Sequence, residues 1–208
     1  MRTSWLIAVL PGLVQPLHAQ TASISARQAI SDFVSNGSPV QRAQAFATAR
    51  GILQQEKGAV PRAVIDSVAD ALARVALRAG GADVHEGSRA IAAIQLGGSS
   101  EARVPYPAFT SLKRIATEAA DIGIRGAALG AMGGITQKNE ALAFLSEVAR
   151  SREPPGDNLA IHALLTIARG FGPEGRDALR KLHESGAVTD DHAASWLNYA
   201  KPRNYAPD

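Results

Sequence analysis

The sequence predicts an all-α fold, in which about four pairs of helices stack into an α-α superhelix with a capping helix at each end. A helical motif recurs at a spacing of 35 residues, since pairs of an alanine and a large apolar residue begin at Ala93, Ala128 and Ala163. Apolar residues follow three- and four-residue steps, and no segment alternates apolar and polar residues as a half-buried strand does. The chain of 208 residues is rich in alanine and only 5% aromatic, which suits closely packed helices.

The turns between the expected helices are marked by glycine, proline and capping residues. An N-terminal capping helix, about residues 25–35, ends at Asn36-Gly37. Ser38 and Pro39 then supply an N-cap and a proline in the first turn of the next helix. The expected helix pairs are 39–57 with 61–79, 86–96 with 107–120, 122–135 with 138–150, and 158–170 with 173–184. A last helix, about 189–200, closes the array.

The second helix of each later pair carries two large apolar residues three positions apart, which share one helical face. These residues are Leu112 and Ile115, Leu142 and Leu145, and Leu179 and Leu182. Their spacing along the chain varies because turn lengths vary, which a repeat array tolerates. The first pair of helices fits the pattern more loosely, as expected of a terminal unit that covers the core.

Residues 1–19 have the features of a bacterial-type secretory signal peptide. Arg2 gives a positive start, residues 5–14 are mainly apolar, and a cleavage site follows Ala19. The apolar stretch is shorter than the roughly 20 residues that span a bilayer, and Pro11-Gly12 interrupts it, which disfavours a retained anchor. The mature chain is therefore expected in the periplasm or outside the cell, with no integral membrane segment.

The mature chain is expected to comprise an N-terminal capping helix (20–37), a repeat array (38–186), and a C-terminal capping helix with a tail (187–208). The chain has no cysteine, which excludes disulfides, thiolate metal sites and a cysteine nucleophile. Its net charge of +3 is slight for this length, so nucleic acid is not an expected partner.

One unit of the array carries a family resemblance over residues 121–145. It has a turn aspartate at Asp121, an arginine in the first helical turn at Arg125, paired alanines, a Leu129-Gly130 step, and a second helix that opens with Glu140. This unit resembles a HEAT repeat of the short bacterial type first described in phycobilin lyases. The resemblance covers about residues 38–186. It implies a right-handed superhelix whose second helices line the concave side, and for most of the family an adaptor role.

Two groups of enzymes use the HEAT architecture, and the residues of this chain favour neither. Deoxyhypusine hydroxylases hold two irons through His-Glu pairs in first helices, where this chain has Gly126-Ala127 and Ile161-His162. Phycobilin lyases act on cytoplasmic chromophore proteins, whereas this chain is expected to be exported. The His-Glu-x-x-His, Gly-x-Ser-x-Gly and Ser-x-x-Lys motifs of other enzymes are absent. We therefore expect no catalytic residue, no cofactor and no metal.

A lone histidine and a run of glycines favour structural roles over binding roles. His162 takes the place of an alanine in the preceding repeats, so it is expected to be a partly buried residue between helices. The glycine-rich run 123–134 lacks the preceding strand and the Gly-Lys ending of a phosphate loop. It indicates close helix packing, with Gly126 and Gly130 on one face.

The C-terminal residues have two readings each. Asp190-Asp191-His192 contains metal-ligating types, but it also fits an acidic first turn that opposes the helix dipole favourably. Trp196 and Tyr199 are three positions apart and are suited to anchoring a partner or to sealing the end of the stack. In both cases the structural role is favoured.

Basic residues lie between the buried leucines of the second helices. We define the basic strip as the residues Lys113, Arg114, Arg150, Arg180 and Lys181, which Arg152 extends. On the expected concave surface they would bind an acidic peptide or an anionic cell-envelope polymer. The alternative is a solvated helical face with no ligand.

The sequence thus predicts an exported, non-catalytic scaffold that binds a protein or peptide through the surface of a HEAT-like solenoid. One alternative is a structural subunit of a cell-envelope complex. Another is an enzyme with a dispersed site, such as a HEAT-type lyase. The identity of the partner and the oligomeric state do not follow from the sequence.

Overall fold

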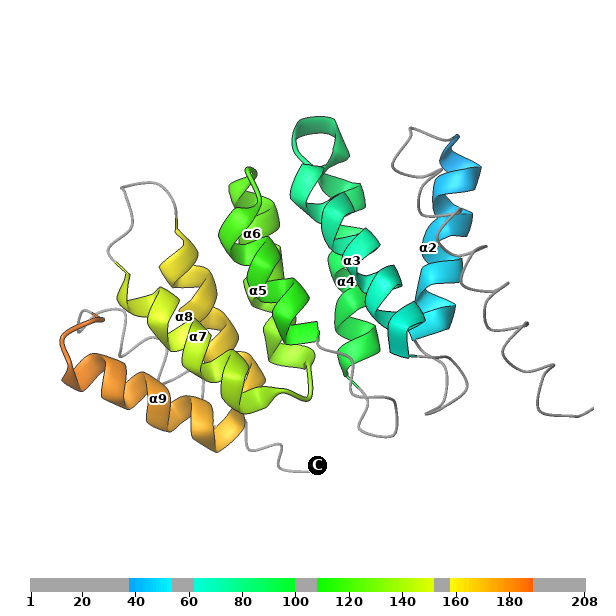
Figure 1. The fold of residues 1–208 in the computed structure, drawn as a ribbon. Coiled ribbons are helices and arrows are strands. Elements are labelled where there is room, and N and C mark those ends of the chain that lie inside the picture. The colour runs from blue at the N-terminus through cyan, green and yellow to red at the C-terminus, as the bar shows by residue number, and fades with distance from the viewer. Residues whose placement is uncertain (1–37, 54–61, 100–107, 152–157, 189–208) are drawn as a thin grey trace, which may run out of the picture.

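The computed structural model describes residues 38–53, 62–99, 108–151 and 158–188 (Figure 1). Within these ranges all regular structure is helical, with eight α-helices, two short 3-10 helices and no strand. This confirms the predicted all-α class. The elements are α2 (Pro39–Leu53), α3 (Arg62–Arg78), η1 (Gly81–Asp83), α4 (Val84–Gly98), α5 (Ala108–Glu118), α6 (Ile122–Ala131), η2 (Met132–Gly134), α7 (Lys138–Arg150), α8 (Leu159–Gly170) and α9 (Gly172–Glu184).

Several predicted features lie outside the described residues. They are the signal peptide, both capping helices, Arg152, Asp190-Asp191-His192, Trp196 and Tyr199.

From α5 onward the predicted helices agree with the observed ones to within two residues, except at the helix predicted over 122–135. There the last turn is the 3-10 helix η2, because this turn packs tightly on both sides. A Cβ added at Gly133 would lie 3.2 Å from the Thr166 side chain, and one at Gly134 only 2.1 Å from the Gln95 amide.

The helices form two layers, and within each layer they are in contact in chain order. In the layer that we call even, α2 contacts α4, α4 contacts α6, and α6 contacts α8. In the odd layer, α3 contacts α5, α5 contacts α7, and α7 contacts α9. Figure 1 shows this progression from α2 at one end of the molecule to α8 and α9 at the other.

The closest packing between the layers is not within the pairs that the sequence predicts. The most extensive contacts join α3 to α4, α5 to α6, and α7 to α8, which are consecutive helices of different predicted pairs. Within the predicted pair of α6 and α7, the short η2 turn lies between the two helices and contacts both of them. Each helix pair is therefore held mainly by its neighbours in the array.

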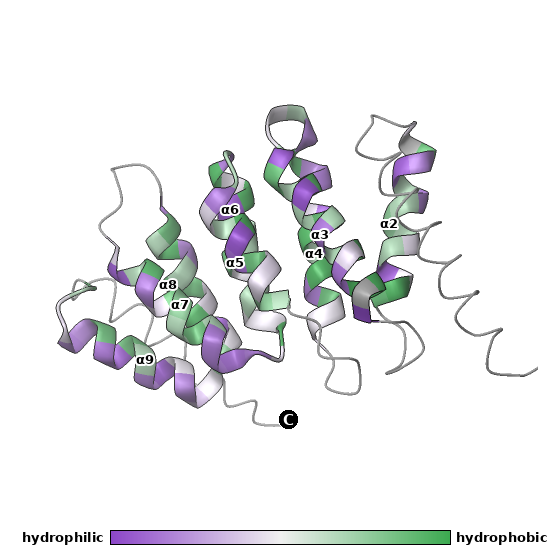
Figure 2. Cartoon of the chain, in the orientation of Figure 1, coloured by the Kyte–Doolittle hydropathy of each residue, from purple (hydrophilic) through white to green (hydrophobic). Residues whose placement is uncertain are grey.

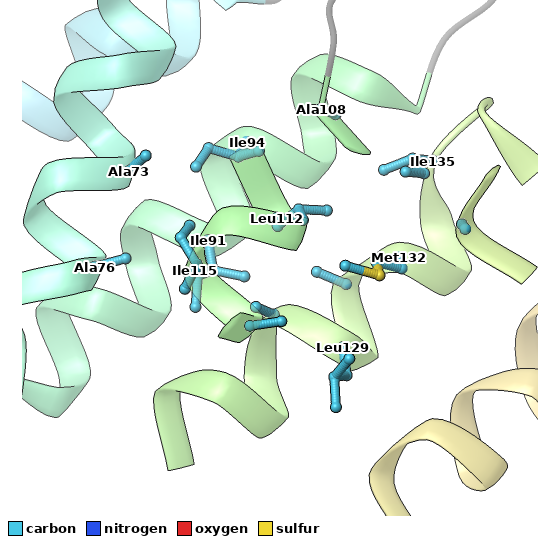
Figure 3. Packing of buried hydrophobic residues seen from close by; sticks show 14 of the residues in the cluster. Ala73, Ala76, Ile91, Ile94, Ala108, Leu112, Ile115, Leu129, Met132 and Ile135 are labelled. Atoms are coloured by element: carbon cyan, nitrogen blue, oxygen red, sulfur yellow. The ribbon is translucent and has the colours of Figure 1, made fainter. Parts of the chain in front are cut away.

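The core is a cluster of mainly aliphatic side chains between the two layers (Figure 3). In its centre Ile94 from α4, Leu112 and Ile115 from α5, and Leu129 from α6 are at most 1% exposed. Burial of each such side chain contributes roughly 1.5–3 kcal/mol. Of the six apolar residues predicted on the second helices, only Leu142 is half-buried instead of buried. Figure 2 shows polar residues interleaved with the apolar ones along the helices, as amphipathic packing requires.

Two helix starts predicted from turn residues are capped by those residues. The Ser38 backbone N–H donates to Gln41 Oε1 at 2.7 Å, and the Gln41 N–H donates to Ser38 Oγ at 3.3 Å, which forms a capping box ahead of α2. The Ile124 N–H donates to Asp121 Oδ1 at 3.0 Å at the start of α6. The side chains thus satisfy backbone donors that the first helical turn leaves free.

Glycine allows close packing in the even layer, though not at both of the predicted positions. Gly126 is buried, and a Cβ there would lie 2.9 Å from the His162 ring. Gly130 is exposed and has no neighbour within 4 Å of an added Cβ, so the prediction that it packs against another helix is wrong. A close approach of two backbones occurs instead between Gly133 and Gly170, where an added Cβ at Gly170 would lie 2.6 Å from the Gly133 Cα.

Lys138 joins the ends of two helices of the even layer. Its Nζ donates to the Gly133 carbonyl at 2.5 Å and to the Gly170 carbonyl at 2.9 Å. The ammonium also lies 4.8 Å from the centroid of the Phe171 ring. These contacts satisfy carbonyls that helix C-termini leave without an intrahelical partner. Burial lowers the pKa of Lys138 from its ordinary value.

Substituting Lys138→Met is expected to reduce the free energy of unfolding by about 1 kcal/mol at neutral pH, since a partly exposed ammonium loses two hydrogen bonds to backbone carbonyls. Because the pKa of Lys138 lies below 10.5 in the folded protein, folded molecules release this proton before unfolded ones do as the pH rises. The unfolded chain then holds more protons, so wild type gains stability relative to the variant as the pH passes the folded-state pKa toward 10.5.

Urea unfolding of wild type and Lys138→Met at neutral and alkaline pH measures this difference. Lys181→Met is a suitable control because that ammonium makes no ion pair or hydrogen bond within the described residues. A stability difference that stays constant or shrinks as the pH rises would contradict the prediction.

Candidate functional site

The structure places the described residues of the basic strip on three consecutive helices of the odd layer. Lys113 and Arg114 lie on α5, Arg150 ends α7, and Arg180 and Lys181 lie on α9. All five side chains are exposed. The sequence pattern therefore predicts their exposure and their common layer, while their partners depend on the packing of the helices.

Arg114 belongs to a network of ion pairs that joins α3 to α5. Its guanidinium lies 3.2 Å from an Asp70 carboxylate oxygen and 3.1 Å from a Glu118 carboxylate oxygen. Asp70 also pairs with Arg74 on its own helix. All of these side chains are about half-exposed, so the pairs contribute little to stability. They do place two carboxylates beside the basic strip.

Lys113 is engaged by aromatic rings between α5 and α7. Its Nζ lies 5.2 Å from the centroid of the Phe144 ring, within the range of a cation–π interaction. Phe109 meets the same ring edge-on, with centroids 6.2 Å apart and an interplanar angle of 74°. Lys113 thus lies over the ring contact between Phe109 and Phe144 in the odd layer.

The remaining residues of the strip lie at the end of the odd layer. Arg180 pairs with Asp177 on the same helix at 3.2 Å. Arg150 and Lys181 make no ion pair within the part of the chain that the structure describes. Of the described residues of the strip, these two cations are available to a ligand without breaking an ion pair or the cation–π contact that engages Lys113.

Arg150 and Lys181 line a hollow of about 430 Å³ between α7 and α9, which we call the α7–α9 hollow. Its lining residues are Asn139, Leu142, Ala143, Ser146 and Arg150 from α7, and Glu174, Asp177, Ala178 and Lys181 from α9. Both helices run from the centre of Figure 1 toward its left side, so their N-terminal ends lie together. The hollow is therefore acidic near the start of both helices and basic near their ends.

A second hollow lies on the even layer, where the sequence analysis predicted no site. It has a volume of about 400 Å³, and we call it the α2–α4 groove. Its lining residues are Ala43, Phe46, Ala47 and Arg50 from α2, and Arg89, Ala92, Ala93 and Leu96 from α4. The sequence did contain a signal for this groove. The helix α2 carries apolar residues on more than one side, so it has a second apolar face besides the one that packs in the core.

The histidines and carboxylates of the described residues do not form a metal site, since no group of three or more lies close enough to hold an ion. His162 was expected to be a partly buried residue between helices. It is exposed, although its ring lies beside α6, 2.9 Å from where a Cβ at Gly126 would be. In the same described ranges, every helix is too short or too polar to cross a membrane.

Comparison of the chain with protein-family models, with curated proteins and with solved structures gave no match. The resemblance to HEAT repeats therefore stays a prediction from the sequence.

Proposed function

We propose that this protein is a HEAT-like solenoid that is exported and acts as a non-catalytic scaffold for a peptide segment of another protein. The proposal of export comes from residues 1–19 alone. The two layers support the solenoid, since each is built by contacts between helices in chain order. The positions that recur every 35 residues also support it, because Ala93, Ala128 and Ala163 are all buried on helices of the even layer.

The observation that carries the peptide-binding role is the α7–α9 hollow in the odd layer. It offers apolar surface in its middle from Leu142 and Ala178, and it has unpaired cations at one end. A hollow with an apolar centre and charged residues around it can take an apolar side chain in the middle and orient charged groups on either side of it. The proposal includes no chemical step.

The charged residues that line the hollow define the expected peptide more closely than the basic strip predicted from the sequence. Carboxylates of the peptide would meet Arg150 and Lys181, and a basic residue would meet Glu174 near the other end. Carboxylates of the protein already neutralise Arg114 and Arg180. We therefore propose a peptide of mixed charge with a central apolar residue instead of a uniformly acidic one.

Selection from a random peptide display library on the purified protein, followed by fluorescence anisotropy with the selected peptide, tests this function. Lys181→Glu is expected to weaken binding about tenfold, and binding should weaken with added salt. Arg89→Glu is the matched control, because it makes the same charge change on the even layer. Equal affinity in wild type and Lys181→Glu, or a loss confined to Arg89→Glu, would contradict the proposal.

A further inference from the structure

The α2–α4 groove is a separate surface whose shape and charge indicate a different ligand. The lining residues occupy two helical turns on each wall, Ala43 to Arg50 on α2 and Arg89 to Leu96 on α4. Since a helix rises 1.5 Å per residue, each wall extends about 10 Å. Figure 1 shows that α2, α3 and α4 alternate in direction, so the walls of the groove are parallel helices.

The floor of the groove is apolar and exposed. Leu96 is 40% exposed, and the alanines at 43, 47 and 92 are exposed as well. The core does not need these residues, because α2 already faces it with Ala45, Ala49 and its C-terminal Ile52-Leu53. Apolar surface gathered in a hollow, beyond what the core uses, marks an interaction surface.

Two arginines lie at opposite ends of the groove and on opposite walls. Because the walls are parallel, Arg89 near the start of α4 lies beside Ala43, and Arg50 near the end of α2 lies beside Leu96. Neither arginine has an ion pair within the described residues, and no carboxylate lines the groove. Among the described residues, no carboxylate thus neutralises the two positive charges of the groove.

We infer that the α2–α4 groove binds an amphipathic helix of a partner protein. Its apolar residues, at three- and four-residue spacing, would pack between the ridges of α2 and α4. Two carboxylates about seven residues apart on this helix would meet Arg89 and Arg50. A single anionic lipid headgroup would contact only one of the two arginines, since they lie at opposite ends of the groove.

Selection from a display library of helical peptides tests the inference. The selected sequences are expected to share apolar residues at three- and four-residue spacing and two acidic residues about two turns apart. The best peptide is then synthesised with a fluorescent label, together with a version in which both acidic residues are lysine. Sequences without acidic enrichment would overturn the inference.

Charge reversal on the protein supplies the second part of the test. Arg50→Glu/Arg89→Glu is expected to weaken binding of the acidic peptide about tenfold or more and to improve binding of the lysine version. Circular dichroism checks that this exposed double variant still folds. Lys181→Glu is the control for the odd layer and should leave binding unchanged. A loss of binding confined to Lys181→Glu would place the selected peptide in the α7–α9 hollow and would overturn the inference for the groove, so the two proposals can be told apart.

Two other occupants of the groove are outcomes that would overturn the inference. One is a membrane, shown if vesicles of phosphatidylglycerol bind the protein through Arg50 and Arg89 while the selected peptides do not compete. The other is a second copy of the chain, shown if sedimentation velocity detects a dimer that Arg89→Glu dissociates. A peptide that binds wild type and the double variant equally would overturn it as well.

Discussion

Gly170→Ala is expected to reduce the free energy of unfolding by about 3 kcal/mol, because the added methyl group meets backbone and not a movable side chain. The new Cβ would lie 2.6 Å from the Cα of Gly133 and 3.0 Å from its carbonyl oxygen. Relief would require α8 to move away from η2. That movement would also lengthen the hydrogen bonds from Lys138, which link the Gly133 and Gly170 carbonyls.

Gly130→Ala is the matched control for this substitution. Gly130 lies in α6, is exposed, and has nothing within 4 Å of an added Cβ. There the substitution is expected to stabilise the protein by about 0.5–1 kcal/mol, because alanine loses less backbone entropy on folding. Urea unfolding followed by circular dichroism measures both variants. Equal midpoints for Gly170→Ala and wild type would show that η2 and α8 are not in close contact.

Leu145→Ala is expected to reduce the free energy of unfolding by about 2–5 kcal/mol, since it opens a cavity in a fully buried part of the core. Leu145 is 0% exposed on α7, which contacts both α8 and α9. Loss of packing there would weaken both contacts at the C-terminal end of the array. Thermal and urea unfolding of the variant measure the loss.

Leu142→Ala makes the same chemical change one turn away on α7 and serves as the comparison. Leu142 is half-buried and lines the α7–α9 hollow, so its truncation is expected to cost only about 1 kcal/mol. The same variant should weaken peptide binding, because it removes apolar surface from the proposed site. If Leu145→Ala and Leu142→Ala reduce the free energy of unfolding by the same amount, the difference in burial between the two leucines is wrong.

The helices could be predicted from the sequence because their signals are local. Leu112 and Ile115 are three positions apart and are both buried on α5, as their spacing indicates. Asp121 caps α6 through a residue only three positions further along the chain. At η2 the local pattern fails because a neighbour intervenes, since this turn packs against Gln95 and Thr166.

The candidate sites could be predicted only in part, because charges acquire partners through packing. The spacing of Lys113 and Arg114 between buried residues predicts that both are exposed. It does not predict that Arg114 meets Asp70, which lies 44 positions earlier. The α2–α4 groove went unpredicted for the same reason, since its walls come from helices separated by all of α3.

The sequence by itself determined where the helices of this protein lie and which face of each is buried. These properties depend on residues three or four positions apart, and hydrophobic burial enforces that spacing in any stable fold. Only the tertiary structure decided which helices pack most closely, which of the described cations have no ion pair, and where apolar surface stays exposed. Each of those outcomes is set by contacts between distant segments, which no local pattern encodes.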